Sequence, residues 1–302
     1  MSEIGLGLAA LGRPAYINLG HAADLGEDRS PDALRERTHQ VLDHAYTRGV
    51  RYFDAARSYG LAEDFLGSWL RSRNPGDVFV ASKWGYTYTA GWRIDAAEHE
   101  VKNLTVGTLR RQLAETRVHL GAWLRLYQIH SATVESGVLE DREVLAELAA
   151  LRETGVRIGL TATGARQSDT IDAAIATGAF DAVQATWNLH ERSAGDALDR
   201  ANAAGMRVIV KEAVANGRLT AGAAPPALAS AARERGATPD ALAIAAALAQ
   251  PWSDVVLSGA STEAMLDSNL AARGLDVEPD LLAELAEPPD EYWSTRSELS
   301  WN

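Results

Sequence analysis

The sequence contains no cysteine. Disulfides, catalysis by a thiolate and metal sites with cysteine ligands are therefore excluded, although this absence does not decide the compartment. Long apolar runs are also missing, and the run from Leu242 to Ala249 is too short to span a bilayer and is typical of a buried helix. The first residues lack a basic segment followed by an apolar run, so we expect no secretory signal. The simplest expectation is a soluble, cytoplasmic protein with no membrane contact.

Positive charge is also scarce. The chain has 29 basic and 41 acidic residues, which gives a formal net charge of −12 at pH 7. Nucleic acids and anionic membranes require clustered basic residues, so we expect a small-molecule partner instead. Lysine is rarest, with only Lys83, Lys102 and Lys211. Because an ammonium and a guanidinium differ in their chemistry, each lysine in an arginine-rich chain requires an explanation.

The chain has instead a regular alternation of short apolar runs with amphipathic stretches in which apolar residues recur three and four apart. The expected strands are Ile4–Leu8, Val50–Asp54, Val78–Ser82, Leu124–Ile129, Val156–Thr161, Ala182–Ala185, Arg207–Val210 and Val255–Ser258. The expected helices are Pro31–Arg48, Ala62–Arg73, Val106–Leu120, Asp141–Glu153, Ser168–Thr177, Gly195–Ala204 and Pro239–Ala249. Helix-capping hydroxyls are expected at Ser30, Ser168 and Thr238, and glycines that end helices at Gly49, Gly155, Gly178 and Gly205.

This order of elements indicates an α/β protein with a (β/α)8 TIM barrel, a parallel eight-stranded barrel with long loops at its C-terminal face. We expect a single domain over residues 1–302. The alternative, a doubly wound open sheet, would require a Gly-x-Gly-x-x-Gly turn after the first strand, and Gly5-Leu6-Gly7-Leu8-Ala9-Ala10 lacks the third glycine. Residues 85–105 and 288–302 are too long to be simple turns, and loops of this kind carry function in barrels.

Polar residues stand at the ends of several expected strands. Because a barrel directs all of its strand ends toward one opening, we expect these side chains to converge. Considered singly, most of them have a structural explanation as caps or packed side chains. A lysine directly after an apolar strand differs, because it is hard to leave buried and unpaired. The set comprises Asp54, Lys83, His130, Thr161, Gln184 and Lys211, with Tyr59 five residues after Asp54.

Four of these residues together would support acid–base chemistry on an oxygen atom. The ammonium of Lys83 would lower the pKa of Tyr59 from its ordinary value near 10. Asp54 would pair with Lys83, and His130 would polarise a carbonyl oxygen. We therefore predict a site that protonates an oxygen while a hydride reaches carbon. No amino-acid side chain carries a hydride, so a nicotinamide would have to supply it.

Four ordered motifs resemble those of the aldo-keto reductase family, and the resemblance covers nearly the whole chain. They are Phe53-Asp54-Ala55-Ala56-Arg57-Ser58-Tyr59-Gly60, Ala81-Ser82-Lys83, Leu126-Tyr127-Gln128-Ile129-His130, and the segment from Val255 through Asn269. The resemblance implies that Tyr59 is the general acid, that Lys83 and Asp54 tune it, and that His130 orients the substrate. It also implies direct hydride transfer from NAD(P)H without a metal.

The resemblance further implies a set of cofactor-binding residues, with three departures from the family pattern. Thr161-Ala162 stands where the family typically has a Ser-Asn pair that holds the carboxamide. Lys211 stands where the family usually has a tyrosine on which the nicotinamide stacks. Neutral residues stand where basic ones hold the 2′-phosphate of NADPH, and a phosphate without cationic partners is poorly held. We therefore expect NADH to be accepted at least as well as NADPH, unless Arg218 or Arg273 reaches in. The set is Thr161, Gln184, Lys211, Gly217, Arg218, Leu257, Gly259, Ala260, Thr262, Met265 and Asn269.

Aromatic residues after Lys83 and near the carboxyl terminus are the expected substrate walls. Aromatic planes bind sugar faces and flat apolar rings alike, so an aldehyde, a ketone or a sugar all remain open, as does the reaction direction. Two other functions also remain open: a non-catalytic, nucleotide-binding regulatory barrel, and a lyase that uses Lys211 as a Schiff-base nucleophile. The family default is a monomer. The expected substrate residues are Trp84, Tyr86, Trp92, Trp187 and Trp293, and Tyr88, Tyr292 and Trp301 are expected to complete the walls.

Overall fold

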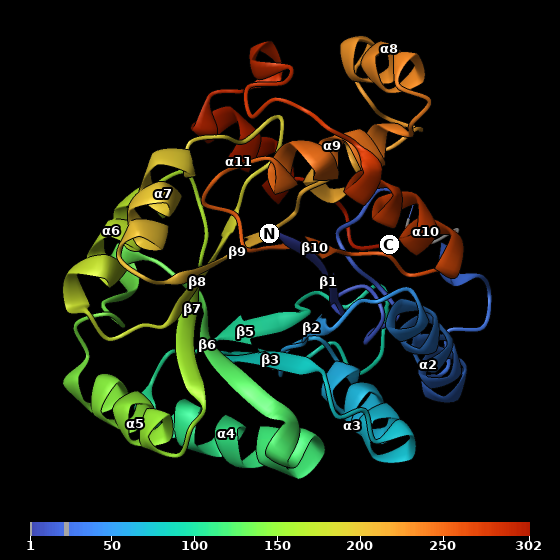
Figure 1. The fold of residues 1–302 in the computed structure, drawn as a ribbon. Coiled ribbons are helices and arrows are strands. Elements are labelled where there is room, and N and C mark those ends of the chain that lie inside the picture. Colours follow the sequence, from blue (N-terminus) through green and yellow to red (C-terminus); the bar gives the residue numbers. More distant parts are fainter. Residues whose placement is uncertain (1, 21–23) are drawn as a thin grey trace.

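The fold is a closed parallel barrel surrounded by helices, as the computed structural model shows for residues 2–20 and 24–302 (Figure 1). Around the barrel the strands follow the order β1-β10-β9-β8-β7-β6-β3-β2. Glu3 of β1 pairs with Val255 of β10 and Leu6 of β1 with Phe53 of β2, which closes the sheet on itself. The barrel strands are β1 (Glu3–Gly7), β2 (Tyr52–Asp54), β3 (Phe79–Trp84), β6 (Leu124–Ala132), β7 (Arg157–Ala162), β8 (Ala182–Thr186), β9 (Arg207–Lys211) and β10 (Val255–Ser258).

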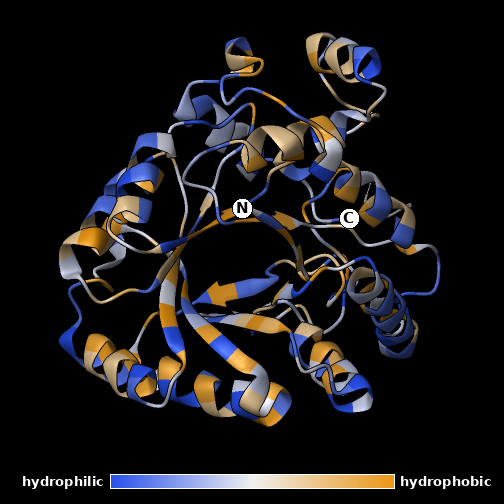
Figure 2. Cartoon of the chain, viewed as in Figure 1, coloured by the Kyte–Doolittle hydropathy of each residue, from blue (hydrophilic) through white to orange (hydrophobic). Residues whose placement is uncertain are grey.

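The helices lie around the outside of the barrel (Figures 1 and 2). Their bounds are α2 (Pro31–Thr47), α3 (Ala62–Arg73), α4 (Val106–Leu120), α5 (Arg142–Glu153), α6 (Gln167–Thr177), α7 (Gly195–Ala203), α8 (Pro226–Glu234), α9 (Pro239–Leu248), α10 (Glu263–Leu270) and α11 (Pro289–Ser297). Helix α8 packs on α9 instead of on a strand. Helix α9 is buried from Ala241 through Ala247, as its apolar run indicates. No helix within the described residues has both the length and the apolar character needed to cross a membrane.

The sequence predicted the barrel and each of its strands to within a few residues, and the local signals explain why. Ser30 and Thr238 cap α2 and α9 by accepting hydrogen bonds from the backbone N–H groups of Ala33 and Ala241. The glycines that were expected to end helices all adopt positive φ angles, as at Gly178 (φ 62°). One cap was wrong. Helix α6 begins at Gln167 without a side-chain cap, and the hydroxyl of Ser168 donates to the carbonyl of Ser193 instead.

The two long segments contain structure that the sequence pattern did not predict. In the segment after β3, β4 (Tyr86–Tyr88) and β5 (Glu100–Lys102) form an antiparallel pair. The carboxyl-terminal segment contains α11, and the chain then returns to the barrel mouth. There, Tyr16 and Asn302 exchange two backbone hydrogen bonds, of 3.1 and 3.3 Å.

The period of a β-strand explains how the barrel separates its core from its site. Side chains alternate between the barrel interior and the helix layer, so residues two apart share a face. One buried cluster, apart from the larger core between strands and helices, takes one residue from each of several strands: Tyr52, Ala81, Leu126, Ala182, Ile209 and Val255. Two residues further along the same strands stand polar side chains: Asp54, Lys83, Gln128, Gln184 and Lys211. An apolar layer therefore supports a polar layer at the carboxyl end of the barrel.

Candidate active site

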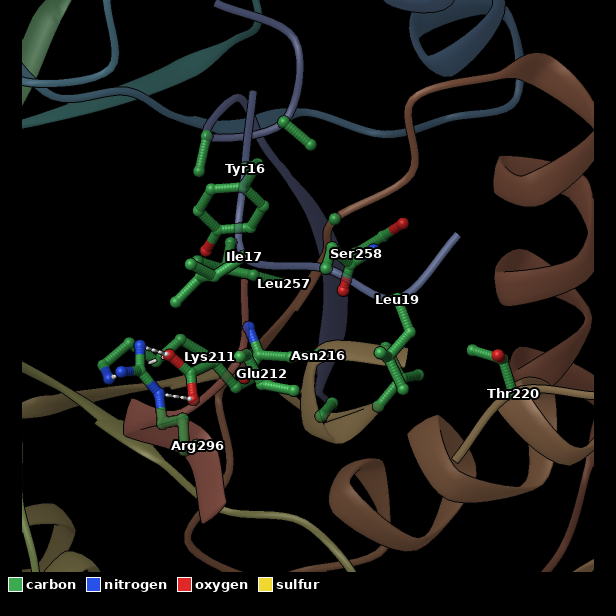
Figure 3. A pocket seen from close by; sticks show the side chains of 18 of the residues that line it. Tyr16, Ile17, Leu19, Lys211, Glu212, Asn216, Thr220, Leu257, Ser258 and Arg296 are labelled. Carbon is green, nitrogen blue, oxygen red and sulfur yellow. Dashed lines mark hydrogen bonds and ion pairs between the residues drawn. The ribbon is translucent and has the colours of Figure 1, made fainter. Parts of the chain in front are cut away.

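The polar layer opens into a cavity of about 800 Å³ at the carboxyl ends of the strands. Its lining includes Asp54, Tyr59, His130, Thr161, Gln184 and Lys211, so the structure brings together the residues that the sequence placed at strand ends. Figure 3 shows part of this cavity, with the Lys211–Glu212 end and the labelled residues Tyr16, Leu257 and Ser258 around it. Among the described residues, no group of three or more histidines or carboxylates could hold a metal ion.

Lys83 lies at the centre of the catalytic candidates, with 1% of its side chain exposed. Its Nζ forms an ion pair with Asp54 and donates to the carbonyl oxygen of Ala55 at 3.1 Å and to the hydroxyl of Tyr59 at 3.2 Å. The amides of Gln128 and Gln184 each donate to the other oxygen of Asp54 at 3.2 Å. The ammonium thus has three acceptors, and the carboxylate is fixed from three sides. A buried charge pair is tolerated only when the hydrogen-bonding groups of both side chains have partners, as they have here.

Tyr59 has its hydroxyl against Lys83 and its ring within the cavity lining. Sequence reasoning expected Lys83 to lower the pKa of this phenol, and the structure corrects that expectation. Burial, followed by the negative charge of Asp54, raises the pKa of Tyr59 well above its ordinary value. The group is therefore protonated at neutral pH, which is the form that can donate a proton.

His130 lies edge-on to Tyr59, with 5.5 Å between the ring centroids. Burial and the positive charges of Lys83 and Lys211 lower the pKa of His130 well below its ordinary value, so the imidazole is neutral. The hydroxyl of Ser58 lies 3.5 Å from Nδ1. If Ser58 donates to Nδ1, the ring proton is on Nε2, and the imidazole is a neutral hydrogen-bond donor.

Two residues of the cavity wall beside Tyr59, Arg13 and Tyr16, were not assigned to the site from the sequence, and they lie there with Trp301, which was expected among the wall aromatics. The guanidinium of Arg13, which is 2% exposed, lies 5.2 Å from the ring centroid of Tyr59 and 4.7 Å from that of Trp301. Glu100 of β5 forms an ion pair with Arg13 at 3.1 Å. The wall therefore combines the β1–α2 connection, the β4–β5 pair and the carboxyl-terminal segment, which are far apart in the sequence.

The opposite wall carries a second charged group, at the end of β9. Arg296 of α11 donates two hydrogen bonds to Glu212, at 2.8 and 2.5 Å (Figure 3). Lys211 donates to the hydroxyl of Thr186 at 2.8 Å and lies 3.7 Å from Glu212. Burial lowers the pKa of Lys211 to about 8, while Arg296 and Lys211 overcome the effect of burial on Glu212 and lower its pKa to about 2.

Comparison with known proteins agrees with this geometry. A family model described as the aldo/keto reductase family matches residues 3–287.

The chain belongs to the aldo/keto reductase family.

Individual relatives are distant. Aldo-keto reductase str7 of Strobilurus tenacellus is 38% identical over 88 residues, which are 29% of this chain and 24% of that protein. The uncharacterized oxidoreductase YqkF of Bacillus subtilis (strain 168) is 26% identical over 153 residues, or 49% of this chain and 41% of that protein. The matches thus span less than half the length of these curated relatives. Among solved structures, aldo-keto reductase AKR11C1 from Bacillus halodurans, in its holo form, aligns with a TM-score of 0.73 over 95% of this chain and 92% of that one, at 20% identity. This likeness shows the fold.

Aldo/keto reductases generally use NAD(P)H, and most of the cofactor positions implied by the resemblance lie in the cavity wall. Those that line it are Thr161, Gln184, Lys211, Leu257, Gly259, Met265 and Asn269. Two of these have protein partners already: Thr161 accepts from the backbone N–H of Ser131 at 2.6 Å, and Gln184 donates to Asp54.

The other four implied cofactor positions do not line the cavity, and their assignment stays a prediction. Arg218 forms an ion pair with Glu287, and its guanidinium lies over the ring of Tyr292. Gly217 (φ 92°) packs against Leu19, where an added Cβ would come within 3.0 Å of the Leu19 side chain. Thr262 caps α10 by accepting from the backbone N–H of Met265, and Ala260 is fully buried.

Of the aromatic residues expected to wall the substrate, Tyr86 and Trp301 line the cavity. Trp84 is fully buried and belongs to the core between strands and helices, because it follows Lys83 on a strand and points to the opposite face. Trp92 packs edge-on to Phe65, and Trp187 packs against Trp252. Trp293 lies behind the charged group, with Lys211 and Arg296 over its ring at 5.7 and 5.3 Å. None of these four tryptophans lines the cavity, and their role in substrate binding stays a prediction.

The sequence did not point to one further residue of the cavity wall. Asn216, in the short 3-10 helix η3 (Ala215–Gly217) after β9, lines the cavity with a left-handed backbone (φ 53°). Its Oδ1 is buried and has no hydrogen-bond partner among the described residues. A buried acceptor of this kind is costly unless a ligand or water satisfies it. No sequence signal distinguishes this asparagine from an ordinary turn residue.

Proposed function

We propose that the protein interconverts a carbonyl compound (an aldehyde, a ketone or a sugar) and the corresponding alcohol, with NAD(P)H as the hydride source and Tyr59 as the general acid–base group. The single observation that supports this most strongly is the linked set Asp54, Lys83 and Tyr59. Asp54 and Lys83 are buried, and Lys83 donates to the hydroxyl of Tyr59, a partly buried phenol in the cavity wall. A binding protein of the same fold would gain nothing from the cost of burying this charge pair.

In the direction of reduction, the hydroxyl of Tyr59 donates its proton to the carbonyl oxygen, and the alcohol O–H forms. The phenolate left on Tyr59 is stabilised by the ammonium of Lys83, whose Nζ is 3.2 Å from that oxygen. Asp54 holds Lys83 in place through their ion pair. His130 is neutral and does not compete for the proton, and its N–H is suited to orient the carbonyl oxygen. In the oxidative direction Tyr59 accepts the proton back.

The cavity fits a nicotinamide dinucleotide in three respects. It extends from Tyr59 and His130 to Ser258, Met265 and Asn269 at the end of β10 and on α10. The unpartnered oxygen of Asn216 lies in its wall. The residues that would hold the group are those in the wall at the implied positions: Thr161, Gln184, Lys211, Leu257, Gly259, Met265 and Asn269. When bound, the dinucleotide supplies the hydride that side chains lack.

Replacing Tyr59 with phenylalanine tests the proposal directly. We expect Tyr59→Phe to abolish detectable turnover in an aldehyde and sugar screen, because the proton donor is lost while the ring and its packing remain. Dinucleotide affinity, measured by quenching of tryptophan fluorescence, should change by less than about threefold, since the hydroxyl is not needed to bind the cofactor. Tyr46→Phe, which removes a phenolic hydroxyl that donates to Asp77 away from the cavity, is the matched control and should retain turnover.

Two results would refute this function. If the wild-type protein binds neither NADH nor NADPH, it is not a nicotinamide-dependent oxidoreductase. If Tyr59→Phe turns over at the wild-type rate, the acid–base role belongs to another group.

One observation supports testing a second function, that of a lyase with Lys211 as its Schiff-base nucleophile. The pKa of Lys211, lowered to about 8, leaves part of its amine unprotonated near neutral pH, as a Schiff-base nucleophile requires. Its hydrogen bond to Thr186 and its proximity to Glu212 indicate a structural or binding role instead. Incubation with a carbonyl compound and borohydride, followed by peptide mass mapping, separates the two. A stable adduct on Lys211 would support the lyase.

A further inference from the structure

Charge is distributed unevenly along the cavity. The basic residues in its described lining are Arg13, Lys211 and Arg296, and all three belong to the groups beside Tyr59 or Glu212. The wall made by α9 and α10 has no basic side chain among the described residues. It has a carboxylate instead, that of Asp240, next to Ala264, Met265, Ser268 and Asn269.

Asp240 is held in place in the first turn of α9. The hydroxyl of Ser268, on α10, donates to its Oδ2 at 2.6 Å, and Ser268 in turn lies 2.9 Å from the hydroxyl of Thr238, which caps α9. No basic side chain of the described residues forms an ion pair with Asp240. A carboxylate has about four acceptor positions, so one hydrogen bond from Ser268 leaves several for a ligand.

The basic residues that might have balanced this carboxylate are used elsewhere. Arg218 is paired with Glu287, and Arg273 donates to the backbone carbonyl of Arg48 at 2.9 Å. Gly259 and Met265, also in this wall, are uncharged. The α9–α10 end of the cavity is therefore acidic, and no basic side chain of the described residues is there to hold a phosphate.

We propose that Asp240 makes this protein selective for NADH over NADPH. The carboxylate accepts a hydrogen bond from a hydroxyl of the adenosine ribose and repels the 2′-phosphate that occupies that position in NADPH. This inference rests on the proposed function, because it assumes that a nicotinamide dinucleotide occupies the cavity with its adenosine toward α10.

An acidic residue in the first turn of a helix also stabilises that helix through its dipole, which is a structural explanation for Asp240. Asp196, in the first turn of α7, has the same local role but does not line the cavity. Substituting each residue by asparagine therefore separates a helix effect, common to both, from an effect on the ligand, which only Asp240 should show.

The experiment is a pair of binding titrations, of NADH and of NADPH, on the full chain, followed by quenching of tryptophan fluorescence. We expect the wild-type protein to bind NADH more tightly by at least about tenfold, because a like charge at close range weakens binding on that order. Asp240→Asn should bind NADPH about tenfold more tightly than the wild type, and Asp240→Arg should prefer NADPH. Asp240→Ala should bind NADH more weakly than the wild type, because alanine lacks the side-chain oxygen that accepts the ribose hydrogen bond and that asparagine keeps. Asp196→Asn should leave both affinities unchanged.

The outcomes distinguish this inference from the function on which it rests. If neither dinucleotide binds to the wild type, the proposed function fails. If both bind but the ratio of their affinities is the same in the wild type, Asp240→Asn and Asp240→Arg, the function stands and the role of Asp240 is refuted. Retained NADH binding in Asp240→Asn shows that this variant is folded. Raising the salt concentration should reduce the wild-type preference if repulsion is its cause, and a preference independent of salt would count against the proposal.

Discussion

Replacing Lys83 with methionine would remove the positive charge at the centre of the candidate site while keeping much of the side-chain volume. The side chains of Lys83 and Asp54 are 1% and 3% exposed, so the carboxylate would remain buried with only the amides of Gln128 and Gln184 as donors. Leaving one member of a buried ion pair without its partner typically costs about 3–5 kcal/mol. We expect Lys83→Met to lower the free energy of unfolding by that amount at pH 7, and Asp54→Leu to do the same.

The double variant Lys83→Met/Asp54→Leu removes both charges and leaves apolar side chains in their place. We expect it to be far more stable than the sum of the single changes indicates, with a coupling energy of about 2–4 kcal/mol, because no uncompensated charge remains. None of the three variants should turn over substrate, since Tyr59 loses the ammonium that stabilises its phenolate.

Urea unfolding followed by tryptophan fluorescence measures these free energies, provided that the slope of the transition is the same in all four proteins. Additive effects, with a coupling below about 0.5 kcal/mol, would show that the two groups do not interact as buried charges and would refute the reasoning. Wild-type turnover in Lys83→Met would separately refute the role of the ammonium in catalysis.

Two further predictions concern pH. Arg296 and Lys211 lower the pKa of Glu212 from 4.5 to about 2. Glu212 therefore contributes roughly 3 kcal/mol of stability that is fully present above pH 4.5 and is lost as the pH falls toward 2. Glu212→Gln should flatten the acid dependence of the unfolding free energy between these pH values. Burial lowers the pKa of Lys211 from 10.5 to about 8, so between these pH values the unfolded chain binds more protons than the folded chain. The free energy of unfolding should therefore rise from pH 8 to 10.5 in the wild type but not in Lys211→Met. The same urea titrations, repeated across pH, measure both effects, and identical curves for wild type and variant would contradict either prediction.

The fold and the acid–base residues could be predicted from the sequence because their signals are local. A strand ends at Asp54, another carries Lys83 and a third carries His130, and the barrel brings these ends together whatever the loops do. The environment of Tyr59 was not predictable in the same way. Its pKa depends on how deeply the loops bury it, and burial outweighs the nearby ammonium that the sequence made visible.

The aromatic part of the cavity wall was predicted poorly because nearness in sequence was used in place of the strand period. Trp84 follows Lys83 directly, and adjacent residues on a strand face opposite sides, so alternation alone assigns Trp84 to the helix layer. The actual wall has no local signal. Arg13 meets Glu100, and Glu212 meets Arg296, across spans of sequence that only the folded loops connect.

The pairing of Tyr16 with Asn302 has a consequence for handling the protein. Trp301 lies in the cavity wall, with Arg13 over its ring and His99 stacked on it at 4.0 Å. A peptide fused after Asn302 would leave the chain beside the mouth of the cavity and compete with the contacts of Trp301. An affinity tag is therefore better attached before β1, which enters at the amino ends of the strands, on the face of the barrel away from the site.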